Sequence, residues 1–427
     1  MFAVLQACSQ LAMAQDQDEL PRRPFRGLFR NRLGASELGH TLDLQWTVLG
    51  GYDHTMRSQD RVADDDRALL NGGFARPYAR LEYEFRAKRT SLHLVGGLGR
   101  RFYSKRASAD VSGLTEATGR VELAAVIGKS TRAQASIGVE QQPFYQLDFL
   151  GTTLPAQITA PAASDLSLLS LRSVDYHGAA SLAQPIGRRA RLVFDFSERR
   201  TTFPSAGDDE QFLWRNANLR LAYGIARYTS VRLGYGRGLS ATTRGLARDP
   251  VDLDSFDVGV DYSRALSFSR RTTVTFATGS TVATQFGERQ LQIVGDVALR
   301  RELHRRWDLN ASYHRGFQFI PGLGAPLFAN TAQLQLAGFL TRRIEFTSSS
   351  GYSSGRYGDR STDPGYSAIT ATTGFRFAFS RVLSIDAGYV FGRYDLGTSL
   401  STATALPDRL DRHGVRVGLT GWLPLVR

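Results

Sequence analysis

The stretch RRARLVFDFSERRTTF, residues 188–203, alternates apolar and polar side chains along most of its length. Leu192, Phe194 and Phe196 share one face of an extended chain, whereas Arg191 and Asp195 share the other. This two-residue period is that of a β-strand. The run is also long enough to cross a bilayer, which takes about 9 to 11 residues of a tilted strand. The stretch therefore predicts a long β-strand with one apolar face and one polar face.

The same alternation recurs from His40 to the end of the chain. Further apolar faces fall at residues 42–48, 79–85, 231–235, 256–262, 291–299, 307–313, 383–391 and 415–419. Tight turns that carry a basic residue, such as Arg270-Arg271, alternate with longer polar connections that are often acidic, such as the one around Asp249, Asp252 and Asp254. Eight such turns, spaced roughly 35 to 45 residues apart with one wider interval, imply about 18 strands in consecutive hairpins.

The predicted fold is all-β: a transmembrane, antiparallel, up-and-down β-barrel of about 18 strands. A propeller is disfavoured because its blades need short strands, and a soluble all-β secreted protein remains the alternative because the same alternation serves both. Lipid offers no hydrogen bonds to open strand edges, so a spanning sheet must close on itself. Strand length, turn alternation and an export signal favour the barrel.

The composition is that of a folded protein that is neither disordered, collagenous nor a coiled coil. The chain has 427 residues, of which 42% are hydrophobic and 22% charged, and its formal net charge is +13. We expect a signal-peptide remnant at residues 1–14, ending in Ala12-Met13-Ala14, and an arginine-rich periplasmic arm or plug at residues 15–39. The barrel is expected at residues 40–427. Cys8, the one cysteine, lies in the remnant; a lipoprotein signal is the less favoured interpretation there.

The polar faces of the strands supply the candidate lining of a lumen. These candidates are Arg80, Glu82, Arg120, Glu122, Arg191, Asp195, Arg199, Arg220, Arg232, Asp257, Asp261, Asp296, Arg300, Asp308, His314 and Arg416. Their charges nearly cancel. They could form an internal ladder of opposite charges that stabilises the wall, or a transverse field that orients polar solutes.

Aromatic residues near predicted strand ends suit the membrane interface, where barrels carry aromatic girdles. The main candidates are Phe268, Trp307, Phe379 and Trp422. A track for stacking carbohydrate is the alternative interpretation.

Catalysis finds little support in the sequence. The seven histidines are scattered without the spacing of paired metal ligands, so we expect no enzyme activity, no metal and no cofactor. The basic charge is scattered over turns, so we expect no nucleic-acid partner. The expected partners are outer-membrane lipid, lipopolysaccharide and the barrel-assembly machinery.

Four phrases carry a resemblance to a known group of proteins. They are VLGGYDHTM at residues 48–56, YSRALSFSRRTTVTF at 262–276, SGYSSG at 350–355 and DRHGVRVGLTGWLPLVR at 411–427. With them the chain resembles uncharacterised bacterial outer-membrane β-barrel proteins, including porins found with exopolysaccharide-export systems. The resemblance implies a location in the bacterial outer membrane and polysaccharide-export components as further partners.

The expected function is a weakly selective pore or export conduit for small polar solutes or saccharides. The alternative is a structural or surface-interaction barrel without an open channel, linked to exopolysaccharide or the envelope.

Overall fold

The computed structural model describes residues 39–57, 72–103, 114–142, 173–203, 210–226, 228–244, 247–266, 269–285, 288–303, 306–318, 327–357, 365–397 and 408–426. The expected signal-peptide remnant and nearly all of the expected arm lie outside these ranges. The first strand begins at Gly39, one residue before the predicted start of the barrel.

The described residues form eighteen β-strands. Their bounds are β1 Gly39–Arg57, β2 Gly72–Arg86, β3 Thr90–Tyr103, β4 Leu114–Ile127, β5 Thr131–Gln142, β6 Ser173–Ile186, β7 Ala190–Phe203, β8 Glu210–Ala226, β9 Thr229–Arg244, β10 Ala247–Leu266, β11 Ser269–Gln285, β12 Glu288–Leu303, β13 Trp307–Gln318, β14 Leu327–Phe339, β15 Ile344–Tyr357, β16 Tyr366–Ala378, β17 Leu383–Asp395 and β18 Arg409–Val426. In the described residues, no helix is long and apolar enough to cross a membrane.

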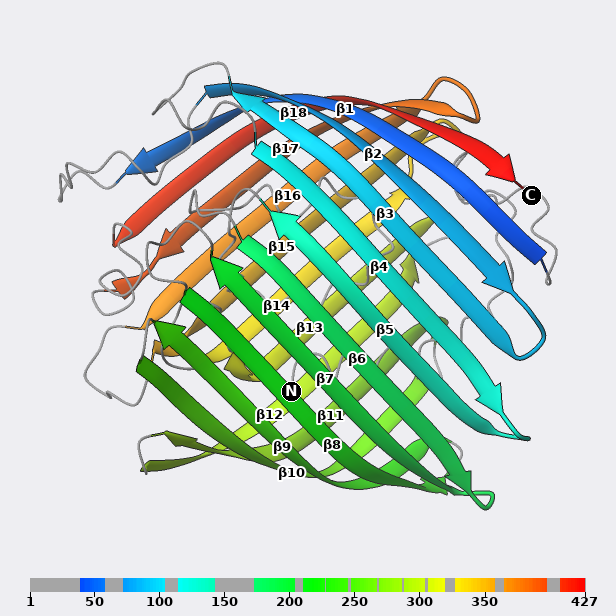
Figure 1. Cartoon of the computed structure of the whole chain (residues 1–427), viewed down its shortest axis with the longest axis vertical. Helices are drawn as coiled ribbons and strands as arrows, with labels where there is room; N and C mark the ends of the chain where they lie inside the picture. The colour runs from blue at the N-terminus through cyan, green and yellow to red at the C-terminus, as the bar shows by residue number, and fades with distance from the viewer. Residues whose placement is uncertain are drawn as a thin grey trace.

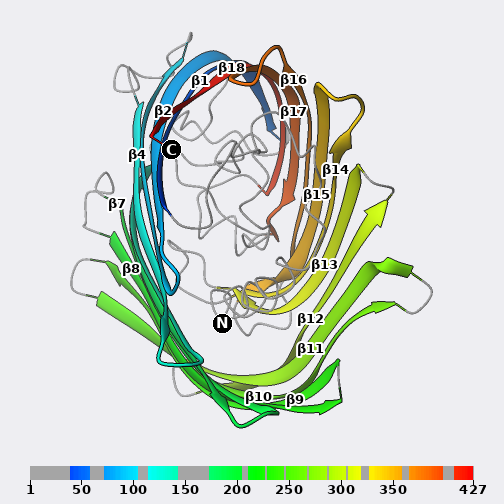
Figure 2. The ribbon, with the colours of Figure 1, turned by 90° about the vertical axis from the view of Figure 1, so that its right-hand side faces the viewer.

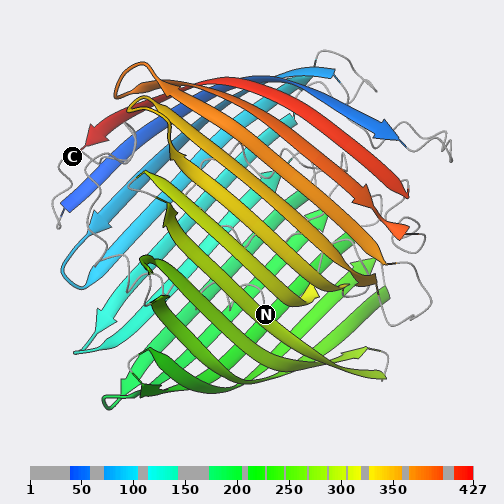
Figure 3. The same ribbon diagram turned by 180° about the vertical axis from the view of Figure 1, so that it is seen from behind.

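The strands form one closed antiparallel sheet. Each strand pairs with its neighbours in the chain, and β1 pairs with β18 from Leu42↔Val426 to Arg57↔Leu410, which closes the ring. Figure 1 shows the wall from β1 to β8 in front, Figure 3 shows the wall from β11 to β17, and Figure 2 shows the closed ring. The predicted up-and-down barrel of about 18 strands is confirmed.

The two ends of the barrel differ in their connections. The tight turns and both ends of the described chain lie at one end, as the pairings Gly39↔Arg86 and Leu42↔Val426 show. Gly128 and Gly187, with φ of 64° and 73°, form two of these turns in the left-handed conformation that glycine adopts without strain. We call this end the tight-turn end and the opposite one the long-loop end.

The long-loop end departs from the predicted pattern at strands β9 to β12. Only residues 245–246 separate β9 from β10, and only residues 286–287 separate β11 from β12. Asp249, Asp252 and Asp254, expected in a long connection, lie within β10 instead. These strands are longer than predicted and their connections correspondingly shorter.

The outer face of the barrel is apolar and exposed. On the neighbouring strands β9 and β10, Leu233 and Val258 pair with each other and are each 60% exposed. Most of the other large exposed hydrophobics, such as Leu98 and Leu219, occupy the same alternating positions on other strands. This pattern is the outward face that a spanning barrel presents to hydrocarbon.

Candidate functional site: the inner face of the barrel

The inner face of the wall is largely polar. Side chains that point into a closed cylinder converge and bury one another, whereas those that point outward diverge. The buried charged and polar residues accordingly lie on the positions that alternate with the exposed hydrophobics. They include Asp53, Asp175, Asp195, Asn216, Arg220, Arg232, His314 and Arg416.

The strand registers place almost all the candidate lining residues on this inner face. They are Arg80, Glu82, Arg120, Glu122, Arg191, Asp195, Arg199, Arg220, Arg232, Asp296, Arg300, Asp308, His314 and Arg416. Asp257 and Asp261 lie in β10, but their side chains are outside the described part of the structure. The structure brings the described candidates into several groups with residues that the sequence did not single out.

A group on β2, β3 and β4 is centred on His93. Its Nε2 lies 2.8 Å from Glu82 Oε1, and its Nδ1 lies 3.4 Å from Glu122 Oε2. Arg80 and Arg120 contact the same two carboxylates, at 3.4 and 2.6 Å. The sequence analysis did not single out His93 as a lining residue. Its position between Leu92 and Leu94, which point outward, could have placed it on the inner face.

A second group joins β6, β7 and β8. Arg199 donates two hydrogen bonds to the carboxylate of Asp175, at 2.9 and 3.0 Å. Asp195 accepts a hydrogen bond of 2.7 Å from Ser181 and lies 3.9 Å from Arg220 Nη2. The fork of Arg199 thus holds a carboxylate bidentately, which is a geometry that fixes both side chains.

The most deeply buried group lies where β1 meets β18. Arg416 Nη2 lies 2.8 Å from Asp53 Oδ1, and Arg412 Nη2 lies 3.3 Å from Asp53 Oδ2. The side chains of these three residues are between 0 and 2% exposed. The Arg416 guanidinium also stacks 4.6 Å from the centroid of the Phe74 ring on β2. The group therefore connects β1 and β18, the two strands that close the barrel, with the neighbouring strand β2.

Two more ion-pair groups lie on the other wall. His314 of β13 pairs with Asp296 of β12 through its Nδ1. Arg376 of β16 lies 2.6 Å from Asp386 of β17 and 3.4 Å from Glu345 of β15. Each of these groups thus combines charges of both signs on adjacent strands.

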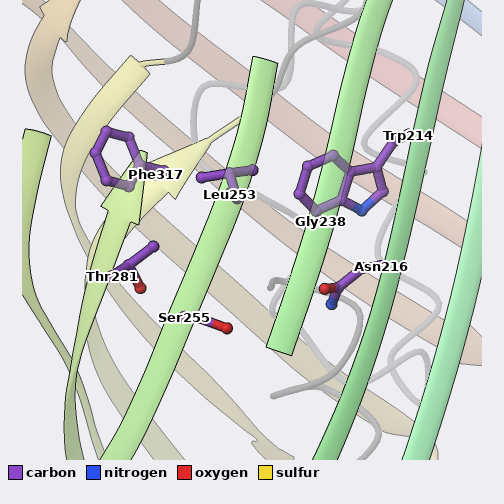
Figure 4. A pocket seen from close by; sticks show the side chains of 7 residues that line it. All are labelled: Trp214, Asn216, Gly238, Leu253, Ser255, Thr281 and Phe317. Atoms are coloured by element: carbon purple, nitrogen blue, oxygen red, sulfur yellow. The ribbon is translucent and has the colours of Figure 1, made fainter. Parts of the chain in front are cut away.

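An apolar patch interrupts this polar face at the long-loop end. Leu253 of β10 and Phe317 of β13 form a buried cluster, with Trp214 of β8 and Phe328 of β14 packed against it. Figure 4 shows the side chains of Trp214, Leu253 and Phe317 converging around a small cavity. The inner face, which the alternation predicts to be polar, therefore also carries an apolar patch at this end.

The candidate interfacial aromatics divide between the faces. Trp307 contacts Phe346, with ring centroids 5.8 Å apart, and Phe379 is 48% exposed and packs edge-on against Phe377 at 4.9 Å. Trp422 instead pairs with Gln45, so it lies on the inner face, contrary to its predicted place at the lipid interface. Phe268 lies outside the described residues.

Within the described ranges, no group of three histidine, cysteine, aspartate or glutamate side chains is arranged to hold a metal ion. The charged groups of the inner face pair with one another across strands.

A closed antiparallel barrel with an exposed apolar outer face and a charged inner face defines a transmembrane β-barrel of the outer-membrane type. No protein-family model matches the chain. No curated protein matches it in sequence either.

Solved structures share the fold with it at low similarity. The chain is similar to OpdQ of Pseudomonas aeruginosa, with 10% identity, a TM-score of 0.46, and coverage of 91% of this chain and 98% of that one. It is also similar to the siderophore receptor PirA of Acinetobacter baumannii, with 7% identity, a TM-score of 0.45, and coverage of 90% and 81%. These likenesses concern the fold alone.

Proposed function

We propose that this barrel is a weakly selective pore of the bacterial outer membrane that passes small polar solutes or saccharides, by uptake or export. The observation that carries the proposal is the mixed charge of the inner face, where arginine or histidine contacts a carboxylate in each group described above. Such a wall offers hydrogen-bond donors and acceptors to a polar solute without a net attraction for one sign of charge.

The outer face supports a place in a membrane. At the tight-turn end, the rings of Phe346 and Phe375 lie 5.1 Å apart, on the same side as Trp307. Toward the long-loop end, exposed tyrosines such as Tyr52 and Tyr176 follow the aliphatic band. An apolar band between aromatic girdles is the arrangement that membrane barrels use at their two interfaces. Lipid, lipopolysaccharide and the assembly machinery are the partners that this placement implies.

The apolar patch favours a second candidate function. Leu253 and Phe317 are only 5% and 4% exposed, so part of the lumen at the long-loop end is filled by side chains. A barrel filled further would be a structural or surface-interaction protein without an open channel. With either function, we also propose that the barrel acts together with components of exopolysaccharide export.

Conductance of the refolded protein in planar bilayers separates the two candidates. We expect stepwise channels with a reversal potential close to zero across a salt gradient, because the inner charges act at close range while charges at the turns are screened within about 8 Å at physiological ionic strength. A strong preference for anions would contradict the balanced wall. Absence of conductance would favour the structural barrel.

A matched pair of substitutions tests whether the inner charges set this balance. Arg376→Gln leaves Glu345 and Asp386 on the inner face without their arginine, so we expect the reversal potential to shift toward cation preference. Arg393→Gln makes the same charge change in the pair with Asp411, which lies on the outer face, and should leave the potential unchanged. Equal shifts in the two variants would refute a wall that controls permeation.

The orientation of the barrel gives a further prediction. Both ends of the described chain lie at the tight-turn end, which biogenesis places in the periplasm. With Cys8 replaced by serine, a cysteine in place of Asp209, between β7 and β8, should react with an impermeant thiol reagent on intact cells. A cysteine in place of Arg343, in the turn between β14 and β15, should react only after the outer membrane is permeabilised. The reverse pattern would overturn the topology.

A further inference from the structure

The wall is not paired along its whole height between β12 and β13. Their register runs from Leu303↔Trp307 to Gly295↔Arg315 and ends there. Beyond this point β13 continues to Gln318, paired with β14 alone, and β12 continues as Glu288–Val294, paired with β11 alone among the described strands. We call this unpaired stretch the β12–β13 seam.

The tip of β13 leaves the line of the wall because its outer face packs inside the barrel. Nearer the tight-turn end, one face of the β13–β14 hairpin points outward. Arg315 and Phe317 belong to this face, as does Phe328, which pairs with Phe317. Yet Phe317 is buried against Leu253, which lies on the inner face of β10. Figure 4 shows Phe317 beside Leu253 and Thr281, and Figure 2 shows β13 turning inside the ring. The tip therefore overlaps the inner side of β11 and β12.

The opposite lip of the seam is apolar and exposed. Leu291 and Ile293 on the outer face of β12 are each 68% exposed, among the highest values of the outer hydrophobics. Val294, the next residue, points inward and is 3% exposed. Apolar side chains thus lie on both sides of the seam, and the patch around Trp214 on the inner side also contains Ser255 and Thr281.

The seam begins at the edge of the hydrocarbon layer. The paired part of β12, Gly295–Leu303, has the length that a strand tilted by about 45° needs to cross a bilayer, about 9 to 11 residues. The unpaired part lies beyond it, on the long-loop side. Open strand edges are costly in hydrocarbon but tolerated at the interface, where headgroups and water supply hydrogen bonds.

We propose that the β12–β13 seam is a lateral port through which the alkyl chain of an anionic lipid in the facing leaflet enters the lumen. The chemistry of the path selects this ligand. The lip and the inner patch are apolar, which suits an alkyl chain, and Arg315 at the last paired position holds its guanidinium 5.2 Å from the Phe328 ring, at headgroup depth. This inference rests on the membrane placement proposed above but not on conductance. The lateral port and the pore function can therefore be refuted independently of each other.

Trp214 reports on the port from inside the barrel. In a variant that keeps Trp214 and replaces Trp46, Trp307 and Trp422 by phenylalanine, fluorescence is measured in vesicles of phosphatidylglycerol whose acyl chains carry bromine, a contact quencher. We expect quenching relative to unbrominated vesicles. We also expect weaker quenching with brominated phosphatidylcholine, and loss of this lipid preference in Arg315→Gln. An unquenched Trp214 would overturn the proposal.

A disulfide across the seam supplies the control for quenching through the wall. If the register continued beyond its last pair, Ile293 would lie opposite Phe317, so a disulfide between cysteines at these positions would hold the tip of β13 beside β12 and close the seam. The matched pair at Val297 and Tyr313 bridges strands that are already paired. Oxidation should lower quenching in the first variant, relative to its reduced form, and leave it unchanged in the second; an equal response in both would refute the port.

Phe317→Ala provides a readout that needs no disulfide. Removal of the ring opens the apolar path, so quenching of Trp214 should rise. Unchanged quenching would count against the port even if the cysteines at 293 and 317 do not oxidise.

Discussion

Replacement of Asp53 by alanine is expected to destabilise the barrel by about 3 to 5 kcal/mol, the typical cost of removing one partner from a buried ion pair. Asp53 is fully buried and contacts Arg412 and Arg416, which are themselves 2% and 1% exposed. Without this carboxylate, two guanidinium groups stay in a buried site that lacks the negative charge between them. The measurement is equilibrium unfolding by urea from lipid vesicles.

The geometry around Asp53 leaves little room for compensation. A Cβ atom on Gly414, the residue paired with Asp53, would lie 2.7 Å from Asp53 Oδ1 and 3.0 Å from Arg416 Nη1. The glycine therefore leaves the space that the ion pair fills. Because the surrounding backbone belongs to the closing strands β1 and β18, a cost here falls on closure of the ring.

Two controls separate burial from charge. Asp411→Ala removes a carboxylate whose partner Arg393 is 47% exposed, so it should cost less than about 1 kcal/mol. Joint replacement of Asp53 by leucine and of Arg412 and Arg416 by methionine removes all three charges and should recover most of the loss. An Asp53→Ala cost no larger than that of Asp411→Ala would contradict the assigned role.

The sequence predicted the features that depend on local pattern. Period-two alternation places Leu192 and Phe194 on one face and Arg191 and Asp195 on the other. The structure shows the same division. Basic tight turns located the hairpins, so the strand number follows from counting them. Both signals lie within a few residues of the feature that they predict.

Features set by contacts between distant strands escaped prediction. Asp53 and Arg416 meet only because β1 and β18 close the ring in one register. The alternation of β13 predicts that Phe317 points outward. In the structure the tip of the strand turns inward, and Phe317 packs against Leu253. No local pattern specifies either partner.

Beyond the hydrocarbon, alternation also loses its meaning. Asp252 and Asp254 lie on the outer face of β10, where Tyr235 donates a hydrogen bond of 2.7 Å to Asp254. Outside lipid both faces of a strand accept polar residues, so this part of β10 looked like a loop. At Trp422 the error has another cause. The outward positions Val415 and Val417 put even-numbered residues of β18 on the inner face, so the alternation itself places Trp422 inside, and its position near the strand end misled the prediction.

The second large effect is expected from Leu233→Arg, which places a charge on the outer face near mid-strand. Leu233 is 60% exposed and lies between Leu221 of β8 and Val258 of β10, so its surroundings are apolar on both sides. In a bilayer an arginine at such depth costs about 2 to 4 kcal/mol. In a barrel whose outer face met water, the same substitution would cost almost nothing.

Leu239→Arg on the same face of the same strand is the matched control. Leu239 lies nearer the long-loop end, between Arg215 of β8 and Asp252 of β10, where charged side chains already occupy the outer face. Because the cost of a lipid-facing arginine falls to about 0 to 1 kcal/mol near the interface, this variant should unfold at nearly the same urea concentration as the parent. The difference between the two leucines therefore measures depth in the membrane, since residue type, strand and face are the same. If both arginines were tolerated equally in reversible folding from vesicles, the exposed band around Leu233 and Val258 would not face hydrocarbon.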